Sequence, residues 1–358
     1  MNDVVRFFDR FTFIILLFIV ILGAFLIFSA SFDSGNNYLT KHILKIVISL
    51  ILFFAVLSFK TETVFRWSLI IYIFLLVVLL FQLFTGKIIS GTKSWIKMGV
   101  LSIQVSEFIK IPVALLLAQF FTKVSILEWG SFFKILIIVI IPFILIGLQP
   151  DMGTAFILLS FLLLSVLLKK IRFSIIIFSL VVLIAGSYTM WNYLLKPYQK
   201  DRIISFVNPG KYSKSSGYQI IQSKIAFGSG GLSGKGYLKG SQSQYKFLPT
   251  RHTDFIASVL GEEFGYLGIS FLLLLFFIFF YRQFNFSVKS DEEFYFIFLF
   301  NGLIFFQFLI NILMVTGLFP VLGIPLPFVS YGGSSMLAFF IGEGLIFKMK
   351  LNTFFQHE

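Results

Sequence analysis

A short polar run, Arg251-His252-Thr253-Asp254, stands directly before a long apolar stretch. An aspartate at the start of a helix stays ionised in the field of the helix dipole, as a proton acceptor must. The same field lowers its basicity, so burial in a cavity or a nearby acid would have to raise its pKa again. Asp254 is therefore the first candidate for a general base, and His252 is the second. The alternative for Asp254 is a helix-start residue without a catalytic role.

Three further charged residues interrupt apolar sequence: Glu107, Lys110 and Asp151. A charge near the centre of a membrane costs about 2.5–3.5 kcal/mol, so each of them needs a reason. Glu107 and Lys110 are three residues apart on one helical face and could neutralise each other. Asp151 could pair with Lys41 or Lys45. The alternative is that all three face one outward cavity, together with the aspartate of the polar run, as supporting or substrate-binding groups.

Two adjacent carboxylates, Glu262 and Glu263, follow about two turns further along the chain, and Glu262 shares a helix face with Asp254. They could hold a divalent ion or pair with basic residues on neighbouring helices. The chain contains no Cys and only 3 His. Without clusters of these residues, the carboxylates alone do not define a metal site, and the metal stays unknown.

A basic interval precedes these residues. Between positions 191 and 252, ten Lys and Arg residues stand against Asp201 as the one acid. This local excess of positive charge favours anionic partners, either lipid headgroups or phosphates. Nothing in the sequence resembles a nucleic-acid-binding module, so no nucleic-acid partner is expected. The candidates for holding phosphate are Arg202, Lys224, Lys235 and Arg251.

A glycine-rich run, Gly228–Gly236, lies inside the basic interval. It does not have the spacing of a P-loop, because Ser229 stands where a Gly is required and Gly236 where a Ser or Thr is required. Two interpretations stay open. The run is either a flexible turn or a nest of backbone N–H groups that binds a phosphate.

Membrane-spanning helices must position these groups. The 358 residues are 58% hydrophobic and include 51 Phe, more apolar surface than a soluble fold of this size can cover. We expect one polytopic all-α membrane domain over residues 1–358, with about ten transmembrane helices. The expected spans are 11–30, 43–59, 66–85, 107–122, 133–149, 152–168, 171–190, 254–281, 294–317 and 332–348.

The Lys and Arg residues of the short loops orient these spans and predict that both termini lie in the cytoplasm. The first span is expected to be retained rather than cleaved as a signal peptide. The segment 191–253 then forms one large extracytoplasmic loop between the seventh and eighth spans, since long loops are translocated largely regardless of charge. Aromatic and basic residues around Trp95, from Gly91 to Gly99, are typical of an interfacial segment.

Residues Asn311–Ser335 closely resemble the signature of the SEDS family (shape, elongation, division and sporulation). The segments Gln104–Lys110, Gln149–Ala155 and Arg251–Glu263 resemble three further motifs of this family, and the resemblance covers nearly the whole chain. The loop from Gly234 to Pro249 is more similar to the rod-shape branch, RodA, than to the division branch, FtsW.

Some positions depart from the family pattern. Val105 stands where a Pro is usual, and Lys41-His42 stands where Arg-Gln is typical. A Lys supplies a point charge rather than the planar fork of an Arg, so the pairing of this cation with Asp151 becomes less certain. Asp254 is unaffected by these departures.

The resemblance implies a bacterial glycosyltransferase of the cytoplasmic membrane that polymerises peptidoglycan from lipid II. The implied partners are lipid II, a class B penicillin-binding protein (a transpeptidase), other membrane proteins of the elongation machinery, and membrane lipids. Asp254 would take the proton of the acceptor hydroxyl, while basic loop residues would hold pyrophosphate. No cofactor is assigned beyond a divalent cation, Mg or Mn, that would accompany the pyrophosphate. The supporting or substrate-binding residues would be Glu107, Lys110, Asp151, Trp95, Lys41, Arg202, Lys224, Lys235, Arg251 and Glu262.

Two rival functions are considered: a lipid II flippase or transporter, and a non-catalytic scaffold of the elongation machinery. A transporter more often shows interrupted helices in two repeated halves around a midplane site. This sequence shows no repeat, and its polar residues gather at one face, which favours an enzyme. A scaffold would tolerate replacement of Asp254 while still binding its partner.

Overall fold

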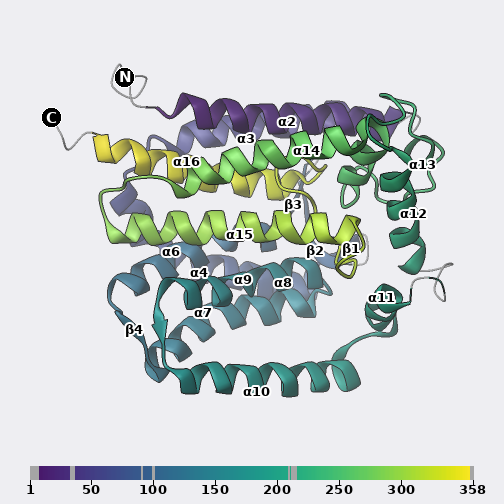
Figure 1. Ribbon diagram of the computed structural model, residues 1–358. Helices are drawn as coiled ribbons and strands as arrows, with labels where there is room; N and C mark the ends of the chain where they lie inside the picture. Colours follow the sequence, from purple (N-terminus) through teal and green to yellow (C-terminus); the bar gives the residue numbers. More distant parts are fainter. Residues whose placement is uncertain are drawn as a thin grey trace.

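The computed structural model describes residues 8–32, 37–89, 92–98, 101–208, 210 and 216–354. Long helices lie side by side and run between two ends of the molecule (Figure 1). The helices are α2 (Arg10–Ser31), α3 (Tyr38–Val56), α4 (Thr61–Thr85), α5 (Val105–Phe108), α6 (Lys110–Thr122), α7 (Trp129–Leu148), α8 (Met152–Leu158), α9 (Ser160–Leu168), α10 (Phe173–Thr189), the π-helical turn η2 (Met190–Leu194), α11 (Pro197–Val207), α12 (Ser216–Ser229), α13 (Ser241–Gln244), α14 (Ile256–Phe284), α15 (Asp291–Val315) and α16 (Gly333–Phe354).

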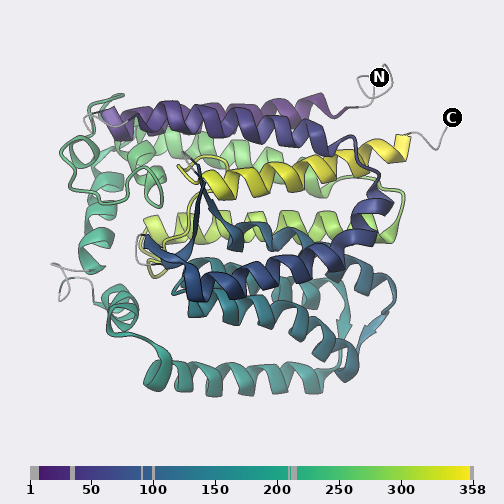
Figure 2. The same cartoon turned by 180° about the vertical axis from the view of Figure 1, so that it is seen from behind.

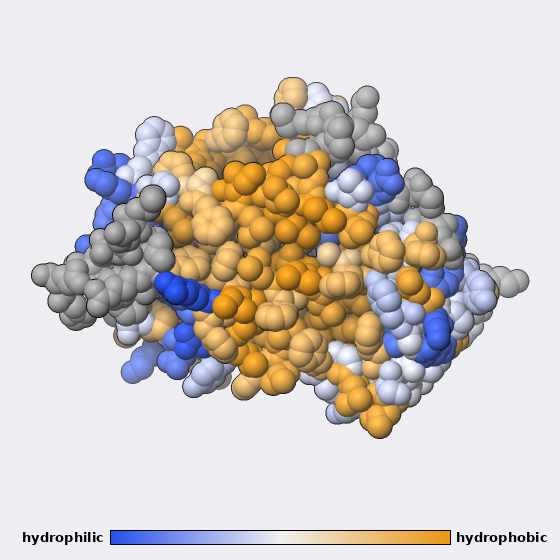
Figure 3. Space-filling view, turned by 90° about the horizontal axis from the view of Figure 1, so that it is seen from above, coloured by the Kyte–Doolittle hydropathy of each residue, from blue (hydrophilic) through white to orange (hydrophobic). Residues whose placement is uncertain are grey.

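The prediction of a polytopic all-α membrane protein is confirmed. Within the described residues, eight helices are long and apolar enough to cross a membrane. The expected span 152–168 is also helical but shorter. The expected span 332–348 lies within α16 except for its first residue, and α16 carries Glu343 and two lysines. An apolar band crosses the middle of the molecular surface, and hydrophilic residues gather at its two ends (Figure 3). Lipid contact accounts for this band.

Several helices extend beyond the expected spans. Helix α3 begins at Tyr38 and α4 at Thr61, five residues before the expected positions 43 and 66. Polar first turns carry no apolar signal, so the apolar runs alone could not locate these helix ends. The extension of α3 matters because it adds Tyr38, Lys41 and His42 to a helical face.

Helix α15 lies at the centre of the bundle. In the most apolar 18-residue stretch of α15, 67% is buried inside the protein. In the corresponding stretch of Phe173–Tyr193, which contains α10, only 6% is buried. Helix α15 packs along α6, and α16 packs along α3. Figures 1 and 2 both show α10 along one edge of the molecule, where ring contacts of Trp129 and Phe133 with Phe178 attach it to α7.

Two small sheets accompany the helices. Strands β1 (Lys87–Ile89), β2 (Thr92–Met98) and β3 (Leu101–Gln104) form an antiparallel sheet in which Trp95 pairs with Gln104. Strands β4 (Ile126–Leu127) and β5 (Lys170–Ile171) pair in parallel. Of the expected interfacial segment, Gly91 and Gly99 lie outside the described residues, and residues 92–98 form β2.

A break in α14 explains the glycine-rich run. At Gly265 the backbone has φ 64° and ψ −155°, which is not helical. The run fills the break: Lys235 N donates to Glu262 O at 3.0 Å, and Gly236 N donates to Glu263 O at 2.9 Å. In return, Tyr266 N donates to Gly231 O at 2.9 Å. A broken helix in a membrane must have its freed backbone groups paired in this way. These two amides of the run are therefore not free to form a phosphate nest.

Candidate functional site

The loop between α15 and α16, residues 316–332, brings the predicted site residues together, and we refer to it as the signature loop. Asn311 Nδ2 donates to Asp254 O at 2.9 Å and to Ile324 O at 2.7 Å. Ser330 Oγ donates to Thr253 O at 2.6 Å. These bonds tie the segment before α14 to the signature loop.

Asp254 lies half-buried in a turn that precedes α14. Helix α14 begins at Ile256, and its N-cap is Phe255, with no side-chain cap hydrogen bond. Asp254 is therefore not the N-cap residue but directly precedes it, and the helix-start interpretation stays open beside the catalytic one.

Asp254 faces Arg202 across Gly323. A Cβ atom added at Gly323 would lie 3.6 Å from Asp254 Oδ2 and 3.9 Å from Arg202 Nη1. Gly323 has φ 75°, a conformation that glycine adopts readily. Its missing side chain leaves room for both the carboxylate and the guanidinium close to the signature loop.

Burial raises the pKa of Asp254 to about 6, and the charge of Arg202 and the Thr253 hydroxyl oppose this rise. For a base at the start of a helix, we expected burial or a nearby acid to raise the pKa, and burial does so here. A carboxylate with a pKa near 6 is ionised at neutral pH and is more basic than an exposed aspartate. Asp254 therefore has the properties of a general base.

His252 lies beside this base and remains the second candidate. Burial, followed by the charge of Arg251, lowers the pKa of His252. Its ring lies 4.7 Å from the Tyr38 ring and 5.9 Å from the Tyr331 ring, measured between centroids. His252 is therefore neutral and packed between aromatic side chains.

The pair Glu107–Lys110 is buried and connects to the signature loop. Lys110 Nζ lies 2.9 Å from Glu107 Oε2, as the sequence spacing predicted. The same ammonium donates to Gln307 Oε1 at 3.2 Å, and Gln307 Nε2 donates to Pro325 O at 3.0 Å. The pair therefore supports the position of the loop opposite the base.

Asp151 joins the start of α8 to the segment before α6. It caps α8, accepting from Thr154 N at 3.2 Å, and it accepts hydrogen bonds from Gln104 Nε2 and from Ser106 Oγ. Within the described chain neither Lys41 nor Lys45 forms an ion pair with Asp151, so the expected pairing is wrong. Burial raises the pKa of Asp151, which is consistent with a carboxyl held by neutral donors.

The four candidate phosphate-binding residues fall into two groups. Arg202 on α11 faces Asp254, and Lys224 on α12 lies over the loop, since a Cβ atom at Gly317 would be 2.8 Å from its Nζ. Lys235 and Arg251 have other contacts. Lys235 Nζ forms a 2.7 Å ion pair with Glu262, and Arg251 Nε donates to Ala30 O at the end of α2.

Glu262 and Glu263 have different partners. Glu262 is fully buried, and besides Lys235 it accepts from Gln242 N at 2.8 Å and from Ser243 N at 3.1 Å. Glu263 accepts from Ser29 Oγ. Among the described residues there is no group of three or more His, Cys, Asp or Glu side chains that could hold a metal. The alternative prediction, that these carboxylates pair with basic residues, is confirmed for Glu262, which pairs with Lys235.

The remaining predicted residues lie around the site. Trp95 is half-buried in β2 beside Gln104, and Lys41 is exposed at the start of α3. Sequence reasoning assigned no role to Gln307 or Asn311. Both are amides in the apolar α15, spaced i and i+4 and therefore on one face, a pattern that could have revealed them.

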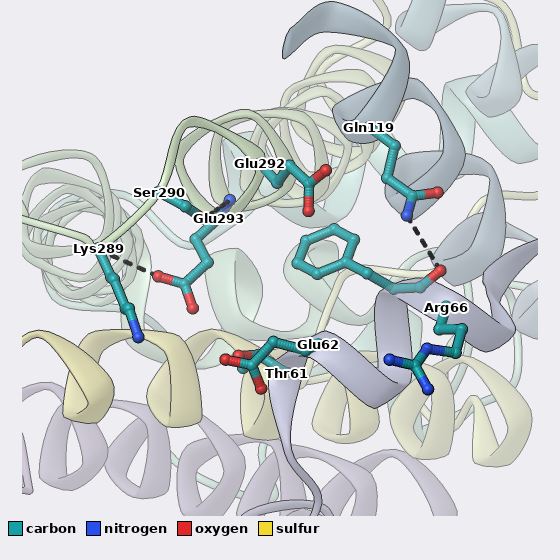
Figure 4. A pocket seen from close by; sticks show the side chains of 9 residues that line it. Thr61, Glu62, Arg66, Gln119, Lys289, Ser290, Glu292 and Glu293 are labelled. Atoms are coloured by element: carbon teal, nitrogen blue, oxygen red, sulfur yellow. Dashed lines mark hydrogen bonds between the residues drawn. The ribbon is translucent and has the colours of Figure 1, made fainter.

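A separate cavity of about 340 Å³ opens at the other end of the helices (Figure 4). It is lined by residues from the ends of α4, α6 and α15, among them Glu62, Arg66, Lys289 and Glu292. None of the predicted site residues borders it. The convergence of a basic carboxylate and two cations at the signature loop makes that loop, and not this cavity, the candidate active site.

Comparisons with known proteins show which family and fold the chain resembles. Residues 9–354 match the model of a family of cell cycle proteins, FtsW/RodA/SpoVE. The chain is 34% identical to the peptidoglycan glycosyltransferase MrdB of Escherichia coli K12 over 95% of its length and 92% of that protein. Its fold resembles a chain of a peptidoglycan synthase complex that coordinates polymerization and crosslinking, with a TM-score of 0.82, 29% identity, and coverage of 95% and 96% of the two chains. It also resembles the crystal structure of the rod shape determining protein RodA of Thermus thermophilus, with a TM-score of 0.71, 24% identity and the same coverage.

Proposed function

Because the chain belongs to the FtsW/RodA/SpoVE family of cell cycle proteins, we propose that it is a peptidoglycan glycosyltransferase that polymerises lipid II for cell-wall elongation and rod shape, with Asp254 as the general base. The observation that carries this proposal is that Asp254 Oδ2 and Arg202 Nη1 both lie close to Gly323. A proton acceptor and a phosphate-binding cation stand together there, as glycosyl transfer from a pyrophosphate requires.

The reaction joins two lipid-linked sugars. Asp254 removes the proton from the 4-hydroxyl of the acceptor sugar as that oxygen attacks C1 of the donor sugar. The bond between C1 and the pyrophosphate oxygen breaks on the opposite face, so the α-linked donor yields a β-1,4 bond. The electron pair leaves with the pyrophosphate, and the proton stays on the Asp254 carboxyl until solvent removes it.

Arg202 and Lys224 would stabilise the leaving pyrophosphate. Both side chains reach the signature loop, and charge-assisted hydrogen bonds to phosphate are stronger than neutral ones. The charge of Arg202 also keeps the pKa of Asp254 from rising further. One guanidinium would therefore serve both the base and the leaving group.

A divalent cation, Mg or Mn, would add positive charge to the pyrophosphate when bound. Asp254 is a carboxylate that this site offers, and Mg²⁺ commonly binds one or two carboxylates together with substrate phosphates. Such an ion would therefore be held mainly by the substrate. Arg202 and Lys224 supply the charge that the chain itself contributes.

We place the protein in the bacterial cytoplasmic membrane, with both termini in the cytoplasm and the segment 191–253 outside. The start of α2 and the end of α16 lie at one end of the bundle, and the signature loop lies towards the other (Figure 1). Lys and Arg in the short connections favour this orientation. Lipid II would then reach the site from the outer leaflet.

A class B penicillin-binding protein is the partner we propose. One similar solved chain belongs to a complex described as coordinating polymerization and crosslinking. Helix α14 exposes large apolar side chains such as Leu267, Phe271 and Phe277, which either lipid or a partner helix could cover. Other membrane proteins of the elongation machinery belong to the same proposal, and so do membrane lipids.

The test is polymerisation of purified, labelled lipid II by the wild-type chain and by Asp254→Asn, each with and without the partner transpeptidase. Glycan chains from the wild type alone are expected. Persisting activity of Asp254→Asn would remove this residue from the role of base. If no variant makes chains but lipid II crosses liposomes that contain the protein, the flippase is the better function.

A further inference from the structure

A cluster of aromatic and basic side chains lies beside the base and takes no part in the chemistry described above. Tyr38, His42 and Lys45 share one face of α3, with the spacing i, i+4 and i+7. This face packs on Tyr331 of the signature loop. Lys45 Nζ lies 3.9 Å from the centroid of the Tyr331 ring, and the His42 ring lies 5.9 Å from it. Tyr331 N donates to His252 O at 2.9 Å, two residues before the base.

Two side chains of this cluster, Lys45 and His42, are buried and have no hydrogen-bond or ion-pair partner among the described residues, although Lys45 Nζ lies over the Tyr331 ring. Lys45 is only 9% exposed, and no carboxylate of the described residues pairs with it. His42 is 0% exposed, and within the described part of the chain neither of its ring nitrogens has a hydrogen-bond partner. A buried cation or imidazole left in this state destabilises the protein unless another group compensates it. An anion beside Lys45 would provide that compensation.

The N-terminus of α16 adds further positive potential at the same place. Helix α16 begins at Gly333 and is 22 residues long. A Cβ atom added at Gly333 would lie 3.0 Å from Lys45 Nζ. A helix N-terminus repels a lysine and attracts an anion. The chain therefore places a cation where the backbone itself favours negative charge.

The signature loop thus has cations at both of its ends. Arg202 and Lys224 lie near Gly323 and Gly317 in its first part, and Lys45 lies near Gly333 just beyond its last residue. Polymerisation brings two lipid-linked pyrophosphates to one base, and two such anions repel each other strongly at short range. One cationic group cannot hold both of them while keeping the two sugars in line.

We propose that Lys45, with His42 behind it, binds the pyrophosphate of one lipid-linked substrate, while Arg202 and Lys224 bind that of the other. The assignment rests on the proposed function, since only a reaction between two such lipids needs both sites. The ammonium sits on a flexible four-carbon stem and can turn from the Tyr331 ring to an incoming phosphate. His42 can then donate a ring N–H to the same anion.

The test counts bound lipids. Native mass spectrometry of the full chain in detergent, with Asp254→Asn as the parent to prevent turnover, measures binding of undecaprenyl pyrophosphate. We expect two molecules on the parent. With Lys45→Gln one molecule should remain, and the affinity of the other event should fall at least tenfold. The double variant Arg202→Gln, Lys224→Gln should lose the other molecule. Two molecules bound to Lys45→Gln with unchanged affinity would overturn the proposal.

Three controls keep the result specific. Lys239→Gln removes an exposed loop lysine and should still bind two molecules. Lys45→Arg should also bind two. Without ligand, Lys45→Gln should have a Tm equal to or above that of the parent, because it removes a buried, unpaired charge. A fall of several degrees would instead assign Lys45 a structural role on Tyr331 and contradict the proposal.

Phosphatidylglycerol separates a substrate site from a site for any anionic lipid. At equal concentration it should not displace undecaprenyl pyrophosphate from the Lys45 site, and displacement would overturn the assignment to the substrate. Polymerisation assays distinguish a failure of the Lys45 site from a failure of the proposed function. An active protein in which Lys45→Gln leaves the KM for lipid II unchanged refutes this site alone. A protein that binds two pyrophosphates but makes no glycan refutes the proposed function alone.

Discussion

The side chain of Asn311 donates a hydrogen bond to the backbone carbonyl of Asp254, 2.9 Å away, although 57 residues separate them in the chain. The same amide group donates to Ile324 O at 2.7 Å. Through these two hydrogen bonds, Asn311 on α15 joins the turn that carries Asp254 to the signature loop. Asn311 therefore helps to hold the backbone of the proposed base in position.

Replacing Asn311 with Leu should leave two carbonyl groups without their donor and cost about 1–3 kcal/mol for each buried group. It should also lower kcat about tenfold or more, because the base moves relative to the loop. Thermal unfolding and lipid II polymerisation measure the two effects.

Asn301 on the same helix provides the control for this change. It is fully buried, and neither polar atom of its side chain has a partner. Asn301→Leu should therefore keep or raise the Tm and leave kcat unchanged. Equal losses in both variants would mean that the hydrogen bonds of Asn311 are not the cause.

The pH profile of kcat/KM should fall on its acidic side with a midpoint near pH 6, because Asp254 has a pKa of about 6 and must be ionised to accept a proton. Below the midpoint, activity should fall about tenfold per pH unit. Arg202 lowers the pKa of Asp254, so Arg202→Gln should move the midpoint to higher pH. Arg202→Lys, which keeps the charge, should move it less. A shift to lower pH in Arg202→Gln would contradict this electrostatic relationship.

The stability of the protein gives an independent check on Asp254. Its pKa in the folded protein lies above the ordinary value of 3.8, so ionisation of this carboxyl opposes folding once the pH exceeds that value. Asp254→Asn should therefore not lower the Tm at pH 7, although it abolishes polymerisation. A large loss of Tm in Asp254→Asn would show that inactivity came from unfolding.

Breaking the buried ion pair Lys110–Glu107 should destabilise the protein far more than breaking an exposed ion pair. Lys110 and Glu107 have side chains only 1% and 5% exposed, so Lys110→Met alone should destabilise the protein by about 3–5 kcal/mol. Adding Glu107→Gln should restore much of this loss. The pair Arg172–Glu128 is 55% and 57% exposed, and Arg172→Gln should cost at most about 1 kcal/mol. Thermal unfolding measures both single variants. Equal losses of stability would contradict the effect of burial on these ion pairs.

The break in α14 requires a glycine. Gly265 has φ 64°, and a Cβ atom there would lie 2.5 Å from Gly234 N. Gly265→Ala should therefore expel the glycine-rich run from the helix and strongly reduce both folded yield and activity. Gly186→Ala in α10 meets no atom within 4 Å and should be neutral or slightly stabilising. Normal yield and activity of Gly265→Ala would mean that the break is not needed.

The sequence by itself determined the class of protein and the residues worth testing. Apolar runs long enough to span a bilayer predict a polytopic helical membrane protein wherever they occur, since backbone groups in lipid must pair within their own segment. A charge within such a run is visible at once, because burying it in lipid is costly. For this reason Glu107 and Lys110 were identified, and their spacing predicted their ion pair. Asp254 was identified by its place directly before an apolar run.

Only the tertiary structure decided which partners these residues have. The four cations Arg202, Lys224, Lys235 and Arg251 look alike in sequence, yet Lys235 pairs with Glu262 and Arg251 bonds to the end of α2, while the other two reach the signature loop. Such pairings depend on which helix ends meet, and local periodicity contains no information about contacts between distant segments. The unpaired burial of Lys45 follows from the packing of α3 on Tyr331 and could not be predicted from either segment alone.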